Sequence, residues 1–165
     1  MGAPSIRLTV PGTLRHRAIA VRVVAEACRL VSRPQDADGG RSENGAHLAP
    51  GYDLSHPFDA AFVSAFAEIF NNIAIHAYQR RDGGTIEMAI SIAGDGLIVE
   101  IRDQGQPFDI DAVPMPELDS LPEGGMGIHI ARALLDEVIY EPGPPNLWRL
   151  VKRLEPEARQ ASTAS

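Results

Sequence analysis

The chain contains one cysteine and fewer basic than acidic residues, and each shortage excludes a class of protein. Cys28 alone cannot form an internal disulfide or a cysteine metal cluster, as expected in a reducing compartment. With 15 Lys and Arg against 22 Asp and Glu, the net charge of -7 argues against nucleic acid or an anionic membrane as the main partner. No segment approaches the roughly 18 apolar residues of a membrane span, and the N-terminus lacks a cleavage pattern. We therefore expect a cytoplasmic protein that binds proteins or small ligands, with no direct nucleic-acid contact and no membrane.

The remaining composition is that of a single globular domain. At 165 residues and 44% hydrophobic content, the chain can bury a core of its own. We assign residues 1–155 to this domain. Residues 33–51 have almost no apolar side chains and many turn formers, which predicts a mobile loop, and the polar tail at 156–165 is expected to be disordered.

Hydrophobic periodicity predicts both helices and strands. The expected elements are a strand at 5–10, helices at 14–31, 55–80 and from 128 onward, a hairpin at 85–103, and a last pair of strands. One face of the hairpin should contribute to the core through Ile86, Met88, Ile90, Ile92, Val99 and Ile101. Cys28 falls at helical spacing with valines, which indicates a buried thiol and not a nucleophile.

The helix expected at 55–80 carries an unusual polar stripe. Glu68, Asn72 and His76 are four residues apart, so they lie one above another on the helix surface. A neighbouring stripe is apolar and should face the core; its residues are Phe62, Phe66, Ile69 and Ile73. Polar groups at the border of a buried face can hold a metal or steer a proton. Taken alone, however, such a stripe is more often an exposed flank than a site.

Two further patterns follow downstream. Asp103 ends the expected hairpin and Gly105 follows two residues later, so a carboxylate there could accept a hydrogen bond from an exocyclic amine while the glycine allows close approach. Gly125 and Gly127 then precede a helix, whose N-terminal amides favour phosphate. Each pattern alone is also ordinary turn or cap chemistry.

Together and in this order, the three patterns resemble the N, G1 and G2 boxes of the GHKL (Bergerat-fold) ATPases. The segments EIFNNIAIHAY, DQGQPFD and GGMGIHIARALLDEV are most similar to the anti-sigma-factor serine/threonine kinases of bacterial partner-switching systems. The likeness covers roughly residues 5–154. It implies an α+β fold, a two-layer sandwich in which about three helices cover a mixed, mostly antiparallel sheet.

The resemblance also implies an activity and the residues that carry it out. The activity is ATP-dependent phosphorylation of a STAS-type anti-anti-sigma partner, with sequestration of a sigma factor otherwise, and the family likeness further implies a homodimer. Asn72 would ligate Mg²⁺ at the ATP phosphates, and Glu68 would act as general base on the serine hydroxyl. His76 would pack at the pocket floor.

The nucleotide itself would be held by residues of the second and third patterns. By the same resemblance, Asp103 would bind the adenine amine and Gly105 would admit the ring. Gly125 and Gly127 would hold phosphate in the lid. Most of the catalysis would then come from positioning and charge neutralisation.

Two departures from the family pattern alter these expectations. From Gln104 through Gly127 there is no Lys or Arg, so turnover is less expected than binding unless Arg132 or a partner supplies positive charge. The final strand, NLWRL, also lacks the Gly-Thr pair common in the family, which predicts modest nucleotide affinity. Two other interpretations stay open: a nucleotide-gated binding module without catalysis, and a detached histidine-kinase catalytic domain, for which an upstream helix pair would be expected.

Overall fold

A computed structural model describes residues 5–34, 54–112 and 126–156, and all described strands join one sheet. The strands are β1 (Ser5–Pro11), β2 (Thr85–Ala93), β3 (Gly96–Asp103), β4 (Glu137–Glu141) and β5 (Asn146–Arg153), and the α-helices are α1 (Arg17–Ser32), α2 (Pro57–Asn72) and α3 (Met126–Leu134). The predicted loop at 33–51 and the tail at 156–165 lie almost entirely outside the described residues.

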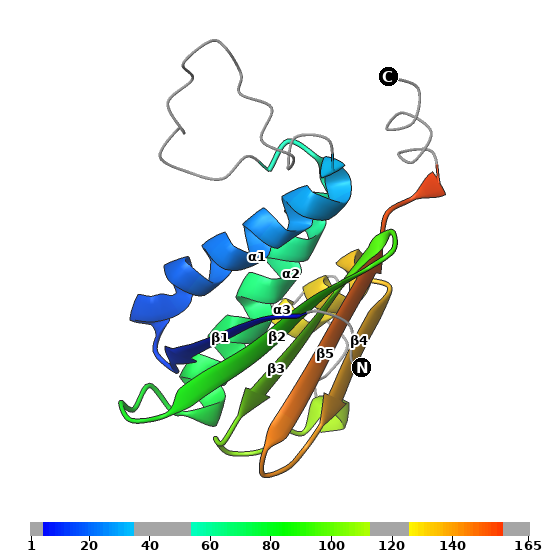
Figure 1. Ribbon diagram of the computed structural model, residues 1–165. Coiled ribbons are helices and arrows are strands. Elements are labelled where there is room, and N and C mark those ends of the chain that lie inside the picture. Colours follow the sequence, from blue (N-terminus) through cyan, green and yellow to red (C-terminus); the bar gives the residue numbers. More distant parts are fainter. Residues whose placement is uncertain (1–4, 35–53, 113–125, 157–165) are drawn as a thin grey trace.

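The sheet has the strand order β1-β2-β3-β5-β4, and the three helices cover one of its faces (Figure 1). This confirms the α+β class and the two layers. Every pairing between the described strands is antiparallel, whereas we expected a mixed sheet. Two of the four pairings are hairpins with short connections, and such connections can join only antiparallel neighbours.

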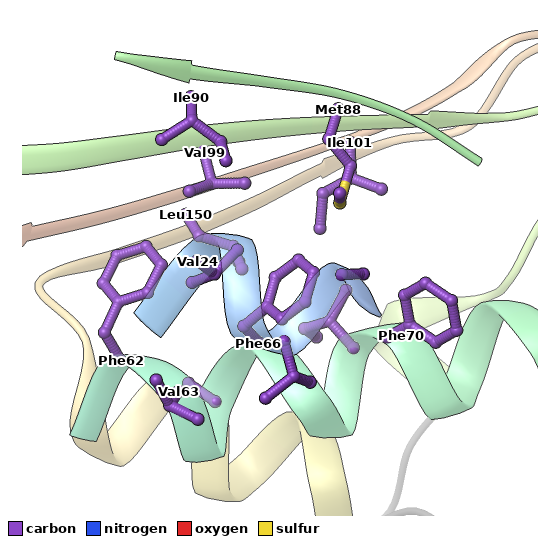
Figure 2. Packing of buried hydrophobic residues seen from close by; sticks show 14 of the residues in the cluster. Val24, Phe62, Val63, Phe66, Phe70, Met88, Ile90, Val99, Ile101 and Leu150 are labelled. Carbon is purple, nitrogen blue, oxygen red and sulfur yellow. The ribbon is translucent and has the colours of Figure 1, made fainter. Parts of the chain in front are cut away.

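Helix α2 supplies the centre of the core. The four residues of its predicted apolar stripe are almost completely buried: Phe62, Phe66, Ile69 and Ile73. Figure 2 shows Phe62 and Phe66 pointing from α2 to the sheet, where Ile101 and Val99 point back. Replacing Phe66 by alanine should cost about 3–5 kcal/mol, since the neighbours cannot fill the space. This packing fixes α2 against the strands that carry the predicted site.

Three local details differ from the sequence-based expectation. The hairpin forms as predicted, but Ile92 is 38% exposed because it lies at the end of β2, beside the turn. The long helix does not remain α-helical to Arg80. It changes at Ile73 into a π-helical turn, Ile73–Ala77, and Gln79 and Arg80 then adopt left-handed backbone angles, with φ of 53° and 57°. The polar stripe therefore loses its regular spacing after Asn72.

By length and composition alone, the helical segment Pro57–Ala77 is apolar enough to cross a membrane, with a mean hydropathy of 1.3. The sequence analysis did not predict a segment of this length and apolarity. In the fold, 56% of the window is buried inside the protein. Its apolarity is explained by the core that it fills, since a helix buried on a broad face needs few polar residues.

Candidate functional site

Segments distant in sequence meet at one end of the sheet. The C-terminal end of α2, the end of β3 and the β4–β5 connection lie together at the lower end of Figure 1. A cavity of about 60 Å³ lies there, lined by residues of the helix end, of β3 and the loop after it, and of β4 and β5. Its lining residues are Asn72, Ile73, His76, Ala77, Asp103, Gln106, Pro107, Phe108, Tyr140, Asn146 and Trp148. The structure thus brings Asn72 and Asp103, predicted from separate motifs, to one cavity.

Asp103 is the buried acid of this cavity. The β-strand alternation that buries Val99 and Ile101 also turns Asp103 to the helix-covered face, where it is 2% exposed. Its Oδ1 accepts hydrogen bonds from the Gly105 amide at 2.9 Å and from Asn146 Nδ2 at 2.8 Å. Among the described residues, no donor reaches Oδ2. That oxygen is therefore available to accept a bond from a ligand.

Burial controls the protonation of Asp103. Loss of solvation raises the pKa of its carboxyl above the ordinary 3.8, while the bonds from Asn146 and Gly105 favour the charged form and lower it. The same negative charge contributes to the raised pKa values of the Tyr78 and Tyr140 hydroxyls, which are raised mainly by desolvation. Both tyrosines therefore remain neutral hydrogen-bonding groups at the edge of the site.

Gly105 permits a close contact between two parts of the protein. A Cβ at this position would lie 2.6 Å from the Ala77 Cβ and 2.7 Å from its carbonyl oxygen. The adjacent amide of Gln106 donates to that same carbonyl at 2.9 Å. The glycine is thus required for the loop after β3 to reach the π turn, a reason different from the predicted admission of a base.

Tyr78 connects the end of the helix to the sheet. Its hydroxyl donates to the Thr85 carbonyl at 2.6 Å and accepts from the Gln104 amide at 2.8 Å. Gly12 and Gly84 lie so close to the ring that a Cβ on either would overlap it. The residue directly after Asp103 is therefore held in place through Tyr78. The motif quoted around Asn72 contained this tyrosine, but its spacing gave no reason to single it out.

Glu68 lies on α2, one turn before Asn72, and faces the start of α3 at Gly127. A Cβ on Gly127 would lie 2.6 Å from Glu68 Oε2 and 3.1 Å from Glu68 Cβ, so the glycine lets the two helices approach at this point. Glu68 does not line the cavity, which ends at Asn72. Gly125, predicted to hold phosphate beside Gly127, lies outside the described residues.

Asn72 and His76 occupy different environments. The Asn72 Nδ2 is buried without a hydrogen-bond partner among the described residues, although its amide borders the cavity. A buried unsatisfied amide is costly and marks a place where a ligand can contribute the missing contact. His76 lines the cavity but is exposed, so it does not form the packed floor that we expected. His76 belongs to the π turn, whereas Asn72 is the last residue of α2.

The donor set around Asn72 is compatible with Mg²⁺ bound chiefly by phosphates. The described residues contain no group of three or more His, Cys, Asp or Glu side chains placed to hold a metal. Mg²⁺ commonly keeps several waters and takes only one or two protein oxygens when it bridges phosphates. Asn72 lines the cavity and carries one amide oxygen, with Glu68 one turn before it on α2.

Aromatic residues form the far wall of the cavity. Tyr140 and Trp148 are cross-strand neighbours whose rings lie 4.4 Å apart, and Phe108 meets Tyr140 edge to face at 6.5 Å. The Tyr140 hydroxyl also accepts from the Phe108 amide at 2.7 Å. We predicted Trp148 as core filling; it is 2% exposed and also borders the cavity. Sequence reasoning missed Tyr140, since one tyrosine in a short strand gives no signal.

The cavity lacks positive charge. No Lys or Arg is among its described lining residues, and Arg132, considered as a source of charge, is exposed on α3 and does not border it. Its volume is also below the roughly 300 Å³ at which ordinary ligand pockets begin. The described residues thus form only a small hollow beside Asp103, without Lys or Arg in its lining.

Comparisons with known proteins support the family resemblance. The histidine kinase-like ATPase domain family matches residues 11–151. The chain is similar to proteins named serine-protein kinase RsbW: 33% identical to that of Bacillus velezensis and 32% to that of Bacillus subtilis, each over 82 residues, or 45% of this chain and 51% of the relative. It is 34% identical to that of Halalkalibacterium halodurans over 45% of this chain and 49% of the relative. The chain spans about half the length of these curated relatives.

One similar solved structure is a histidine kinase domain from Erythrobacter litoralis EL346 blue-light activated histidine kinase, at 21% identity and a TM-score of 0.47 over 64% of this chain and 48% of that one. The family match is the stronger finding, because it spans most of the chain and includes all three motifs. It confirms the resemblance drawn from Glu68, Asn72, Asp103, Gly125 and Gly127. The chain belongs to the histidine kinase-like ATPase domain family.

Proposed function

We propose that the protein is an ATP-dependent serine kinase and anti-sigma factor, which phosphorylates a STAS-type anti-anti-sigma partner and otherwise sequesters a sigma factor. One observation carries the proposal: the buried acid Asp103 and the unsatisfied amide of Asn72 border the same cavity, with Glu68 one helical turn beyond. The similarity to proteins named serine-protein kinase supports a serine as acceptor.

Each residue has a distinct task in this proposal. Asp103 Oδ2 accepts a hydrogen bond from the adenine amine, and the aromatic wall of Tyr140 and Trp148 lies beside the base. Glu68 takes the proton of the partner's serine hydroxyl. As it does so, the serine oxygen bonds to the γ-phosphorus of ATP, and the bond between that phosphorus and the ADP oxygen breaks. Gly127 lets the start of α3 approach Glu68, so that helix N-terminal amides face phosphate.

A bound Mg²⁺ would neutralise phosphate charge and fix the phosphate geometry. Asn72, which lines the cavity, would hold it through its amide oxygen. Since no Lys or Arg lines the described cavity, the ion would supply much of the positive charge needed there.

The same shortage of positive charge favours a second candidate function. In it, the nucleotide only sets the conformation near the start of α3, and the protein acts as an exchangeable binder without phosphate transfer. The two candidates differ at Glu68, because a binder needs no general base.

Replacing Glu68 by glutamine tests the choice between them. The substitution keeps the shape of the side chain and its contact with Gly127 but removes the base. With ATP, Mg²⁺ and the STAS proteins of the same organism, transfer to serine, read by mass spectrometry, should fall by about 10²–10⁴-fold. Binding of ATP should change little. Glu26→Gln, on the exposed side of α1, is the matched control.

The outcomes separate the two functions clearly. Wild-type protein that binds ATP but phosphorylates no STAS partner supports the binding module. Equal transfer by wild type and Glu68→Gln would show that phosphorylation occurs without the role assigned to Glu68.

A further inference from the structure

Asn146 was not singled out from the sequence, yet the structure gives its side chain three hydrogen bonds. Nδ2 donates to Asp103 Oδ1 at 2.8 Å and to the Gly105 carbonyl at 2.9 Å, and Oδ1 accepts from the Gly143 amide at 2.9 Å. The residue is 1% exposed, so these bonds form away from water. Asn146 therefore joins the end of β3, the loop after it and the β4–β5 connection.

This arrangement leaves Asn146 without a donor for a ligand. An amide nitrogen has two N–H groups, and both are used within the protein. Asp103 Oδ1 likewise already accepts two bonds, so the remaining carboxylate oxygen, Oδ2, is the one available to the cavity. Asn146 therefore has no free N–H for a ligand, and its donated bonds act on the ligand through Asp103 and the Gly105 carbonyl.

We propose that Asn146 is a positioning residue for nucleotide recognition, which holds Asp103 Oδ1 inside the protein so that Oδ2 is presented to the base. The inference rests on the proposed function, in which Asp103 accepts a bond from the adenine amine. The register supports it, because Asp103 and Asn146 are direct partners in the β3–β5 ladder and lie on the same face of the sheet. Side-chain length and strand pairing together fix the contact.

A residue that only tied the strand ends together would act on stability and not on the charge of Asp103. The bond from Asn146 favours the ionised form of the acid, so a positioning role also predicts a response to pH. The titratable groups around this pair are Tyr78, Tyr140 and His76. Wild-type protein contains all three, so the ratio of variant to wild-type affinity at each pH cancels their contribution.

Asn146→Asp is the decisive variant. The substitution preserves the shape and the acceptor for the Gly143 amide, but it replaces Nδ2 by an oxygen 2.8 Å from Asp103 Oδ1. Two carboxylates at this distance repel each other, which raises one apparent pKa of the pair, so that the pair takes up one shared proton as the pH falls. At pH 8 the variant should bind ATP with Mg²⁺ about 10- to 100-fold more weakly than wild type, measured by calorimetry. The ratio should recover toward pH 5.5, as the shared proton restores a donor to Oδ1.

Controls separate binding from folding. Asn71→Asp makes the same chemical change on α2 at an amide that contacts Arg17 and does not line the cavity, so its ATP affinity should match wild type at both pH values. Thermal melts at each pH report the folded fraction. If Asn146→Asp does not fold, Asn146→Ala decides: a folded alanine variant should lose about tenfold or more in affinity at every pH.

The results bear differently on the two proposals. If the wild type binds ATP and both Asn146 variants bind it with an affinity within twofold of the wild type at pH 5.5 and pH 8, the positioning role is overturned. The proposed function is left intact by that result. Weaker binding by Asn146→Asp that does not recover at pH 5.5, with an unchanged melt, also overturns it. Absence of ATP binding by the wild type itself removes the proposed function, and the inference with it.

Discussion

Replacing Asp103 by asparagine should separate ligand recognition from the stability of the sheet end. The amide oxygen can still accept from Gly105 and Asn146, so both internal bonds are retained. The NH₂ group then stands where Oδ2 stood and presents a donor to the adenine amine, which is itself a donor. Loss of one hydrogen bond to a charged group corresponds to about 1.5–3 kcal/mol, and the facing donors add to it. ATP affinity should therefore fall by at least about tenfold.

The free energy of unfolding of Asp103→Asn at pH 7 should not fall as its ATP affinity does. Because burial raises the pKa of Asp103 in the folded state, the native protein holds this proton to higher pH than the unfolded chain does. The stabilising contribution of the protonated acid is complete below 3.8 and is lost as pH rises through the raised pKa. At pH 7 the wild type pays for a buried charge that Asp103→Asn does not carry. The variant should be at least as stable there, with the difference vanishing in acid.

Two assays check this pair of outcomes. Calorimetry with ATP and Mg²⁺ measures affinity, and urea unfolding at pH 7 and below pH 3.8 measures the free energy of unfolding. Asp82→Asn, at an exposed carboxylate after the π turn, controls for the loss of one negative charge. The reasoning is refuted if Asp103→Asn binds ATP as wild type does, or if it is less stable than wild type at pH 7.

Three further substitutions test the surrounding packing. Tyr78→Phe keeps the ring but removes two hydrogen bonds, so urea unfolding should show a loss of about 1–2 kcal/mol, and an unchanged midpoint would contradict the anchoring role. Gly105→Ala places a Cβ 2.6 Å from Ala77 and should cost about 1–3 kcal/mol in the same assay; an unchanged stability would mean that the loop moves freely. In Gly127→Ala the added Cβ would lie 2.6 Å from Glu68 Oε2, the movable end of that side chain. Phosphate transfer should therefore fall while the melting temperature changes little. Normal transfer would exclude a role for the close approach of α3 to Glu68.

The elements of the fold were predictable because their signals are local. The 3.6-residue periodicity of α2 and the alternation in the hairpin at 85–103 each depend on neighbours in sequence, and the structure confirms both. Asn72 could be selected because it lies on a polar stripe beside the buried one, and Asp103 because it stands where the hairpin strand ends. Their common cavity could be expected only from the family resemblance.

The residues that sequence reasoning missed depend on pairing between distant segments. Asn146 follows two prolines and reads as an ordinary turn residue until the β3–β5 register places it opposite Asp103, 43 residues earlier. The contact between Gly105 and Ala77 likewise exists only once the loop reaches the π turn. The π turn itself has no sequence signature here, so the prediction of a regular helix as far as Arg80 was wrong beyond Asn72.

The position of the site follows from how the core ends. Along the helix-covered face, one ladder row contains Val99 and Leu150 and the next contains Ile101 and Trp148, all buried. The following row contains Asp103 and Asn146, equally buried but polar. The alternation of the strands forces these two side chains inward, and they remain tolerable there because they satisfy each other. The proposed recognition site is therefore the last row of the core, in which the exchange of apolar for polar residues leaves one carboxylate oxygen for a ligand.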